Sequence, residues 1–143
     1  MKRKGLLIVI SGPSGAGKGT VYNEVLARRP EIRRSVSVTT RAPRKGEIDG
    51  VHYYFKTVEE YQRMIANGEF LETASVYSNY YGTPKAPVYE MLADGNDVMF
   101  EIDTLGAKQI KQIYPEAVTM FIIPPSFEIL EQRLRARGTD SED

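Results

Sequence analysis

The chain has 143 residues, and its 19 basic and 19 acidic side chains cancel, which argues against a general nucleic-acid binder with its usual basic excess. Its length and its 41% hydrophobic content suit one domain, alone or with a small insertion. Because it has no cysteine and no apolar stretch of membrane-spanning length, we expect no disulfide, no thiolate zinc site and no membrane partner, and we expect a cytoplasmic location.

The first predicted element is a buried strand over 5–11, because a continuous apolar run is typical of a strand in a parallel sheet. The glycine-rich stretch GPSGAGKGT follows over 12–20. A helix is predicted from about Lys18 to Arg29, since Pro30 cannot continue it. This succession of strand, glycine loop and helix is the context that a phosphate-binding loop requires.

Residues 35–84 are polar and rich in tyrosine, and we interpret them as an inserted lobe, because alternation, turn residues and charges replace the long apolar runs. Thr57 and Glu60 have the spacing of a capping box at the start of a helix. The predicted elements are an extended segment over 35–40, a charged loop over 41–50, an extended segment over 52–55, a helix from Thr57 to Gly68, a strand over 69–77 and a turn over 80–84.

The remaining chain returns to strands that alternate with helices. The predicted elements are a helix over 85–93, an apolar strand over 97–103, a helix over 105–113, an apolar strand over 117–123 and a helix from Ser126 to about Arg137. Together with the first strand, the two apolar strands give the βαβ rhythm of a parallel sheet that helices cover on both faces. The predicted fold class is therefore α/β.

Gly12, Gly17 and Lys18 match the phosphate-loop pattern G-x-x-x-x-G-K. The glycines allow backbone amides to converge on phosphate oxygens, the helix start adds partial positive charge, and the lysine reaches the outer phosphates. The pattern departs at Gly19, where a hydroxyl normally touches Mg²⁺, and Thr20 is the nearest substitute. The candidate ATP-binding residues are Gly12, Pro13, Ser14, Gly15, Ala16, Gly17, Lys18, Gly19 and Thr20.

A second cluster of candidate binding residues lies in the charged loop. Arg41 and Arg44 are close together, and Tyr53 follows shortly after. Guanidinium groups suit multi-oxygen anions such as phosphate, and tyrosine hydroxyls add donors. The alternative is an ordinary solvated loop, since Glu47 lies among these cations.

The same stretch resembles guanylate kinase. That family carries the signature S-x-T-T-R-x-P-R-x-G-E-x-x-G-x-x-Y-x-F, which residues 37–55 match. The resemblance continues through GEFLE (68–72), NYYGT (79–83), EIDTLGAKQIK (101–111), IIPPS (122–126) and RLRARGTDSED (133–143), so that it spans the whole chain. It implies a P-loop NTPase fold with a parallel-sheet core over 1–34 and 89–132, an inserted GMP-binding lobe over 35–88 and the start of a lid over 133–143.

The resemblance also implies an activity, the transfer of the γ-phosphate of ATP to GMP or dGMP with Mg²⁺ as cofactor. The residues implied to bind GMP are Arg41, Arg44, Tyr53 and Tyr81 at the phosphate, and Ser37, Glu72, Thr83 and Asp103 around the guanine. The residues implied to stabilise the negative charge of the phosphoryl group during its transfer are Lys18, Arg41, Arg133 and Arg137. Thr20 and Asp103 are expected on the Mg²⁺ side, partly through water.

The chemistry of guanine supports the role implied for Glu72. Guanine presents adjacent N1–H and N2–H₂ donors, which one ionised carboxylate accepts side by side, whereas adenine cannot donate twice. Without the resemblance, Glu72 would be an ordinary surface acid. Asp103 ends an apolar strand at the sheet edge where ligands gather, but a strand-end acid can also simply accept from a backbone amide. Arg133 and Arg137 likewise suit a solvated basic edge of a helix.

Two departures from the family leave alternatives open. Leu105 stands where the family commonly has glutamine, and the family continues for several tens of residues beyond the position of Asp143. The sequence thus resembles a guanylate kinase truncated within its lid. The alternatives are a GMP-binding fragment with little turnover and an interaction module with none. The sequence predicts no oligomeric state.

Overall fold

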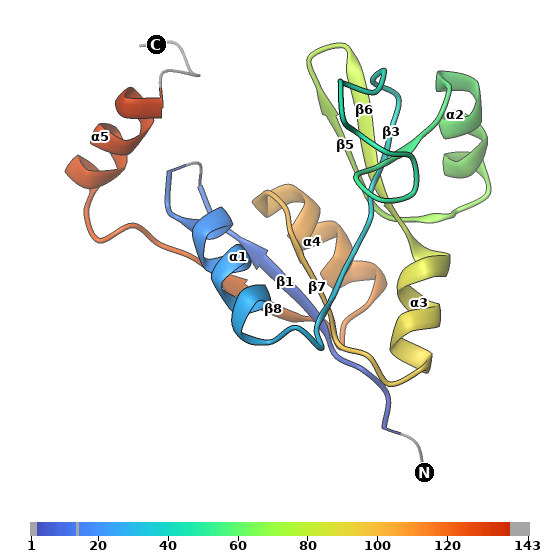
Figure 1. Cartoon of the computed structure of the whole chain (residues 1–143), viewed down its shortest axis with the longest axis horizontal. Coiled ribbons are helices and arrows are strands. Elements are labelled where there is room, and N and C mark those ends of the chain that lie inside the picture. The colour runs from blue at the N-terminus through green and yellow to red at the C-terminus, as the bar shows by residue number, and fades with distance from the viewer. Residues whose placement is uncertain (1–2, 14, 138–143) are drawn as a thin grey trace.

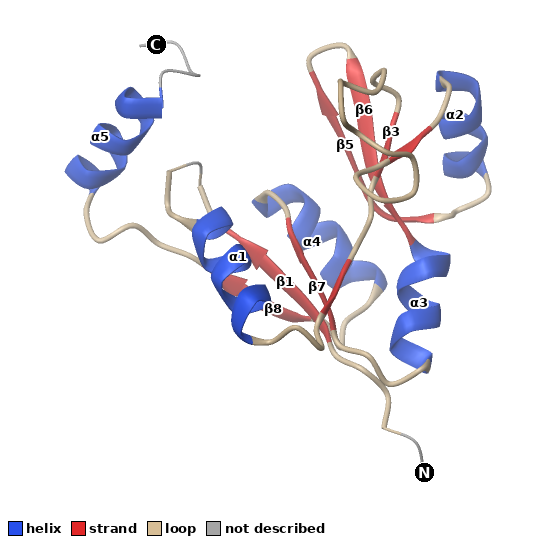
Figure 2. Ribbon diagram, viewed as in Figure 1, coloured by secondary structure: helices blue, strands red, loops and turns tan. Residues whose placement is uncertain are grey.

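The computed structural model describes residues 3–13 and 15–137 (Figures 1 and 2). Its elements are β1 (Leu7–Ser11), α1 (Lys18–Arg28), β2 (Arg33–Arg34), β3 (Val38–Thr39), β4 (Tyr54–Phe55), α2 (Val58–Ala66), β5 (Phe70–Val76), β6 (Asn79–Pro84), α3 (Lys85–Ala93), β7 (Val98–Glu101), α4 (Thr104–Ile113), β8 (Val118–Phe121) and α5 (Phe127–Arg137). Within these described ranges, no helix is both long and apolar enough to cross a membrane.

The first sheet is parallel throughout and has the strand order β2-β7-β1-β8. The side chains of β1 alternate between two apolar layers. Leu7 and Val9 pack with residues of α3 and α4, while Ile10 packs with Leu26 of α1 and Met99 of β7. Helices therefore cover both faces of the sheet at β1 and β7, as Figure 1 shows, and the predicted α/β class is confirmed.

The second sheet has the order β4-β3-β6-β5 and, together with α2, forms what we call the second lobe. Its β3–β6 and β5–β6 pairs are antiparallel, and its β3–β4 pair is parallel. The predicted capping box starts α2: the Glu60 amide donates to the Thr57 hydroxyl at 3.1 Å, and the Thr57 amide donates to the Glu60 carboxylate at 2.9 Å. Tyr61 of α2 then packs on Val38 and Phe70 of the sheet.

The turn predicted over 80–84 is wrong, because these residues belong to β6, which pairs with β5 along its whole length. The chain instead reverses before β6, at Tyr77, whose φ of +56° lies in the left-handed region. Gly82 suggested a turn, but it serves close packing inside the strand. A Cβ atom there would lie 2.7 Å from the Phe70 ring, so only glycine leaves room for that side chain.

The strand predicted over 117–123 exists as β8, but it is not buried. Val118, Met120 and Phe121 are 43%, 41% and 55% exposed. Among the described strands, β8 lies at the edge of the first sheet and pairs with β1, and α5 lies apart from it in Figure 1. Within the extended segment predicted over 35–40, the structure has one short strand, β3, which joins the second sheet, while β2 lies just before this segment and joins the first. Residues 35–37 therefore connect the two sheets.

Candidate active site

The loop over 12–17 leaves the carboxyl end of β1 and enters α1 at Lys18. Gly17, the residue before the helix, has a φ of +96° that side chains rarely allow, and it offers α1 no side-chain cap. The Lys18 amine folds back over the loop and donates to the Gly12 carbonyl at 3.1 Å. The structure thus brings the described residues of the predicted phosphate loop together at the start of a helix, where backbone amides can bind an anion. Ser14, also predicted here, lies outside the described residues.

The position of Gly19 explains its missing hydroxyl. A Cβ atom on Gly19 would lie 3.3 Å from the Oε2 atom of Glu101, at the end of β7. The Glu101 carboxylate thus occupies the space into which a serine or threonine at this position would project, and Thr20 next to it is exposed. The sequence patterns indicated no role for Glu101. The parallel pairing of Ile10 with Glu101 is what carries it to the loop.

α5 contacts the same loop from the other side. Arg133 donates through Nη1 to the Gly15 carbonyl at 3.1 Å. Leu130 and Leu134 lie one turn apart beside Gly15, where a Cβ atom would come within 3.0 Å of Leu130. One of the two arginines predicted at the start of the lid therefore lies on the phosphate loop, while the side chain of Arg137, the other, lies outside the described part of the structure.

The second lobe brings the predicted arginine and tyrosine residues together. Arg41 forms a bidentate ion pair with Glu47, with Nη1 and Nη2 donating at 2.8 and 3.0 Å. The side chains of Arg41 and Glu47 are only 12% and 19% exposed, so this part of the loop is not a solvated charge cluster. Arg41 lies 5.2 Å from the centre of the Tyr53 ring, which itself lies 6.1 Å from the Tyr81 ring. Arg44 is exposed nearby.

The ion pair fixes the charge state of both partners. Hydrogen bonds from the Arg41 guanidinium and then from the Arg44 amide lower the pKa of Glu47 to about 2. The carboxylate in turn raises the pKa of Arg41, helped by hydrogen bonds to Tyr81 and Tyr53. In the sequence, Glu47 supported the alternative of a solvated loop, whereas in the structure it holds Arg41 beside the two tyrosines.

Glu72 and Thr83 are opposite each other on β5 and β6, and both are buried, at 6% and 1% exposure. The Thr83 hydroxyl donates to Glu72 Oε1 at 2.7 Å. Burial raises the pKa of Glu72, the Thr83 hydrogen bond opposes that shift, and the Asp103 carboxylate adds to it. Glu72 is therefore a buried hydrogen-bond acceptor and not a surface acid.

Asp103 and Glu72 converge on the start of α4. The Asp103 Oδ1 atom accepts from the Gly106 amide at 2.7 Å, so Asp103 caps the helix, which was the alternative weighed for it. A Cβ atom on Gly106 would lie 3.2 Å from both Asp103 Oδ1 and Glu72 Oε2. Only glycine leaves this space open beside the two acids. Leu105 next to it is 71% exposed and packs in no core cluster of the described chain.

Ser37 is half-buried at the entry to β3, and its carbonyl accepts from the Tyr54 amide at 2.8 Å. Ser37 and the other predicted acceptor residues thus come from the second lobe, except Asp103. The second lobe and α5 rise on either side of the carboxyl ends of β1 and β7 (Figure 1). The arrangement therefore has the predicted loop residues on one side and the predicted acceptor residues on the facing lobe.

The family model described as guanylate kinase matches residues 4–143. The guanylate kinase of Carboxydothermus hydrogenoformans is 61% identical over 140 residues, which are 98% of this chain and 69% of that protein. The guanylate kinase of Clostridioides difficile is 55% identical over 140 residues, 98% of this chain and 68% of that protein. The crystal structure of guanylate kinase from Anaplasma phagocytophilum aligns with a TM-score of 0.70 and 39% identity, covering 96% of this chain and 70% of that one.

Proposed function

The chain belongs to the guanylate kinase family, and from this premise we propose that it transfers the γ-phosphoryl group of ATP to GMP or dGMP, giving ADP and the guanosine diphosphate. Its partners are then ATP and GMP, and its role is guanine nucleotide synthesis and recycling in the cytoplasm. We assign the donor side to a core over 1–34 and 89–132, the acceptor side to an inserted lobe over 35–88, and the start of a lid to 133–143.

We assign the donor phosphates to the loop over 12–20. Gly17 provides no side-chain cap for the first amides of α1, and the N-terminus of this helix favours negative charge. Lys18 already lies across the loop, where it can turn from the Gly12 carbonyl to a phosphate oxygen. Arg133 reaches the loop from α5 and adds a second cation on the side opposite to Glu101.

We assign the phosphate of GMP to Arg41, Arg44, Tyr53 and Tyr81. The Glu47 carboxylate occupies Nη1 and Nη2 of Arg41 on one side, which fixes the guanidinium plane before any ligand arrives. Such preorganisation lowers the entropic cost of holding a phosphate in one orientation. Arg44 is exposed and, among the described residues, its guanidinium makes no ion pair as close as that of Arg41, so it can approach a phosphate from solvent.

The observation that carries the choice of GMP is the buried carboxylate of Glu72. Its Oε1 atom is held by Thr83, and its Oε2 atom faces the space beside Gly106. An ionised carboxylate in that position accepts from guanine N1–H and N2–H₂ together. AMP would leave the buried acid without donors, and a buried unpaired carboxylate costs several kcal/mol, on the order of 3 or more.

The residues beside the loop fit Mg²⁺. The Glu101 carboxylate forms no hydrogen bond or ion pair with the residues that the structure describes, and it would repel phosphates unless a cation lay between them. Mg²⁺ in kinases is commonly held by one or two carboxylates together with substrate phosphates. We propose Glu101 and Thr20 as its nearest protein groups, with Asp103 acting through water. When bound, the ion neutralises charge on the phosphates.

The transfer needs no protein nucleophile. An oxygen of the GMP phosphate attacks the γ-phosphorus of ATP as the bond from that phosphorus to the β,γ-bridging oxygen breaks, which releases ADP. Catalysis is then a matter of alignment and charge stabilisation. We assign the stabilisation of the transferring group to Lys18, Arg41, Arg133 and Arg137.

A coupled assay of ADP release tests the proposal. With ATP and Mg²⁺ present, ADP should appear when GMP is added and not when AMP or CMP is added. A preference for AMP would overturn the assignment. Calorimetric binding of GMP without turnover would show that the 143-residue chain is a GMP-binding unit and not a complete catalyst.

A further inference from the structure

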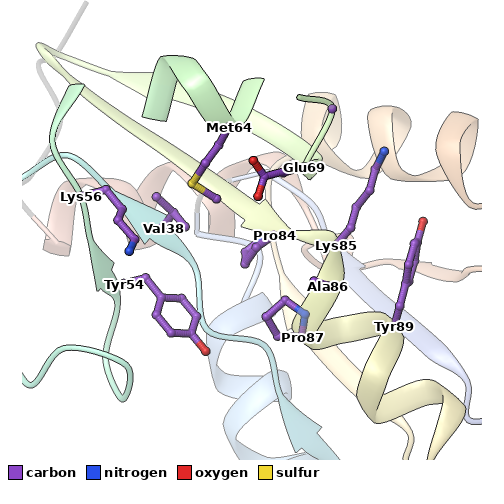
Figure 3. Close-up of a pocket in the computed structure, with 11 residues that line it drawn as sticks. Val38, Tyr54, Lys56, Met64, Glu69, Pro84, Lys85, Ala86, Pro87 and Tyr89 are labelled. Atoms are coloured by element: carbon purple, nitrogen blue, oxygen red, sulfur yellow. The ribbon is translucent and has the colours of Figure 1, made fainter. Parts of the chain in front are cut away.

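A cavity of about 470 Å³ lies between the second lobe and the first turn of α3 (Figure 3). Its volume falls within the range of about 300–1,000 Å³ that small-molecule pockets occupy. Its walls are largely apolar, formed by Val38, Tyr54, Met64, Pro84 and Pro87. None of these side chains belongs to the proposed donor or acceptor sites.

The cavity lies on the opposite face of the second sheet from the acceptor cluster. Successive side chains of a strand point to opposite faces. Tyr54 and Val38 pack on the side of α2, whereas the neighbouring Tyr53 lies against Arg41. A molecule in the cavity therefore leaves the acceptor residues uncovered.

The rim of the cavity is positively charged. Lys56 and Lys85 line it, and in the described part of the chain neither amine has a hydrogen bond or an ion pair. Figure 3 shows the Lys56 amine directed between Tyr54 and Val38. Glu69, the only acid among the lining residues, accepts from the Asn67 side chain at 3.3 Å. α3 starts at Lys85 without a side-chain cap, which adds partial positive charge.

We propose that this cavity binds a small organic anion with a flat apolar body, of the class of aromatic carboxylates, at a site separate from those of ATP and GMP. The apolar walls remove the body of the ligand from water, and the Lys56 ammonium group, which is directed between Tyr54 and Val38, pairs with its carboxylate. A neutral ligand of the same shape gains only the first of these contributions. The charge on the ligand therefore distinguishes this site from general apolar adsorption.

The test uses 2-naphthoate as the probe and the full chain labelled with ¹³C in its methionine methyl groups. The Met64 methyl signal should shift with a saturable dependence and a dissociation constant of about 1 mM. The signal of Met120, which is exposed on β8, should stay in place. Saturating GMP should leave the Met64 shift unchanged, because GMP occupies the other face of the sheet.

Charge variants test the role of the rim. Lys56→Gln should weaken 2-naphthoate binding about threefold, whereas Lys85→Gln, whose amine points away from the cavity in Figure 3, should weaken it less. Lys108→Gln, on the exposed surface of α4, is the matched control and should bind as the wild type does. Neutral 2-naphthamide should bind the wild type and Lys56→Gln equally weakly.

A filling variant tests the location. Ala86→Phe places a ring in the cavity from the exposed start of α3 and should abolish the Met64 shift. Ala27→Phe, which adds the same ring on the exposed surface of α1, should not. The proposal is overturned if the shift is absent, if GMP displaces the probe, or if neither the charge variants nor Ala86→Phe changes it. The two proposals fail separately. If the chain does not bind GMP in a separate titration, the proposed function is refuted, whereas the Met64 shift with 2-naphthoate still tests this cavity.

Discussion

Replacing Glu72 by glutamine keeps the size and planarity of the side chain but exchanges one carboxylate oxygen for an NH₂ group. The amide oxygen can still accept from the Thr83 hydroxyl, which donates at 2.7 Å in the wild type. The NH₂ group then faces the space beside Gly106, where the proposed guanine would present two donors. Two donors that face each other form no hydrogen bond, so the variant should lose GMP affinity without losing its fold.

The size of the loss follows from the buried position of Glu72, which is 6% exposed. A hydrogen bond to a charged group contributes about 1.5–3 kcal/mol. With about 1.4 kcal/mol for each factor of ten, a loss of about 2–3 kcal/mol weakens GMP binding roughly 30- to 150-fold. ATP affinity should not change, because the phosphate loop lies on the other sheet. The affinity for IMP, which lacks the 2-amino group, should fall by less than the affinity for GMP. The ratio of the two affinities should therefore be smaller in the variant than in the wild type.

Thermal unfolding at several pH values separates this effect from misfolding. Burial raises the folded-state pKa of Glu72 above its unfolded value, so the native state binds the proton more tightly and stability falls as pH rises through the raised pKa. Glutamine has no charge to bury. At neutral pH the nucleotide-free variant should therefore melt at or above the wild-type temperature, and the difference should vanish in acid.

Isothermal titration with GMP, IMP and ATP measures the affinities, with Glu59→Gln on the exposed face of α2 as the control. Unchanged GMP affinity in a Glu72→Gln protein of undiminished thermal stability would refute the assignment of Glu72 to guanine. A parallel loss of ATP affinity would show that the substitution disturbs the protein more widely than the structure predicts.

Other variants test the remaining contacts. Arg41→Lys cannot make the bidentate pair with Glu47, so KM for GMP should rise about tenfold or more in steady-state assays, and an unchanged KM would count against a phosphate contact. In the wild type, the pKa of Glu47 falls from 4.5 in the unfolded chain to about 2 in the folded one, so its contribution to the free energy of unfolding is complete above pH 4.5 and is lost as the pH falls toward 2. Because Arg41→Lys weakens the ion pair, its free energy of unfolding should fall by less over the same pH range. Glu101→Gln should increase the affinity for a fluorescent ADP without metal and reduce the further increase in affinity that Mg²⁺ brings. If Mg²⁺ raises the ADP affinity of the variant and of the wild type by the same factor, Glu101 is not near the bound Mg²⁺. Thr57→Ala breaks the capping box and should lower the free energy of unfolding by about 1 kcal/mol in urea titrations, without changing GMP affinity.

Local signals predicted the parts of the fold that local chemistry decides. The apolar run at β1 and the glycine loop after it predicted a buried strand and an anion site, and Thr57 with Glu60 predicted the start of α2. The same signals failed where a distant neighbour decides. Gly82 suggested a turn because the sequence does not show the Phe70 ring packed against it. The exposure of β8 could not be predicted either, since an apolar run carries no information on what covers it.

In the candidate site, too, local sequence signals predicted some residues, while contacts between distant parts of the chain decided others. Motif spacing pointed to Lys18 and Arg41, whereas Glu72 and the other residues around the proposed guanine were implied only by the resemblance to a family. Spacing did not predict that Glu47 would hold Arg41, because an acid near an arginine is as common in a solvated loop as in a bidentate pair. Nor did it bring Glu101 to Gly19, since that contact depends on the register between β1 and β7.

The two sheets are closely linked along the chain. Residues 35–37 lead from β2 to β3, and β6 passes directly into α3, which packs on the first sheet. Such connections restrict the orientations of the second lobe relative to the phosphate loop. Folding therefore fixes the relative position of the two nucleotide sites in advance, so that less entropy is lost in each turnover when the two nucleotides are brought together. Each bound nucleotide then meets the other at an effective concentration far above that of either in solution.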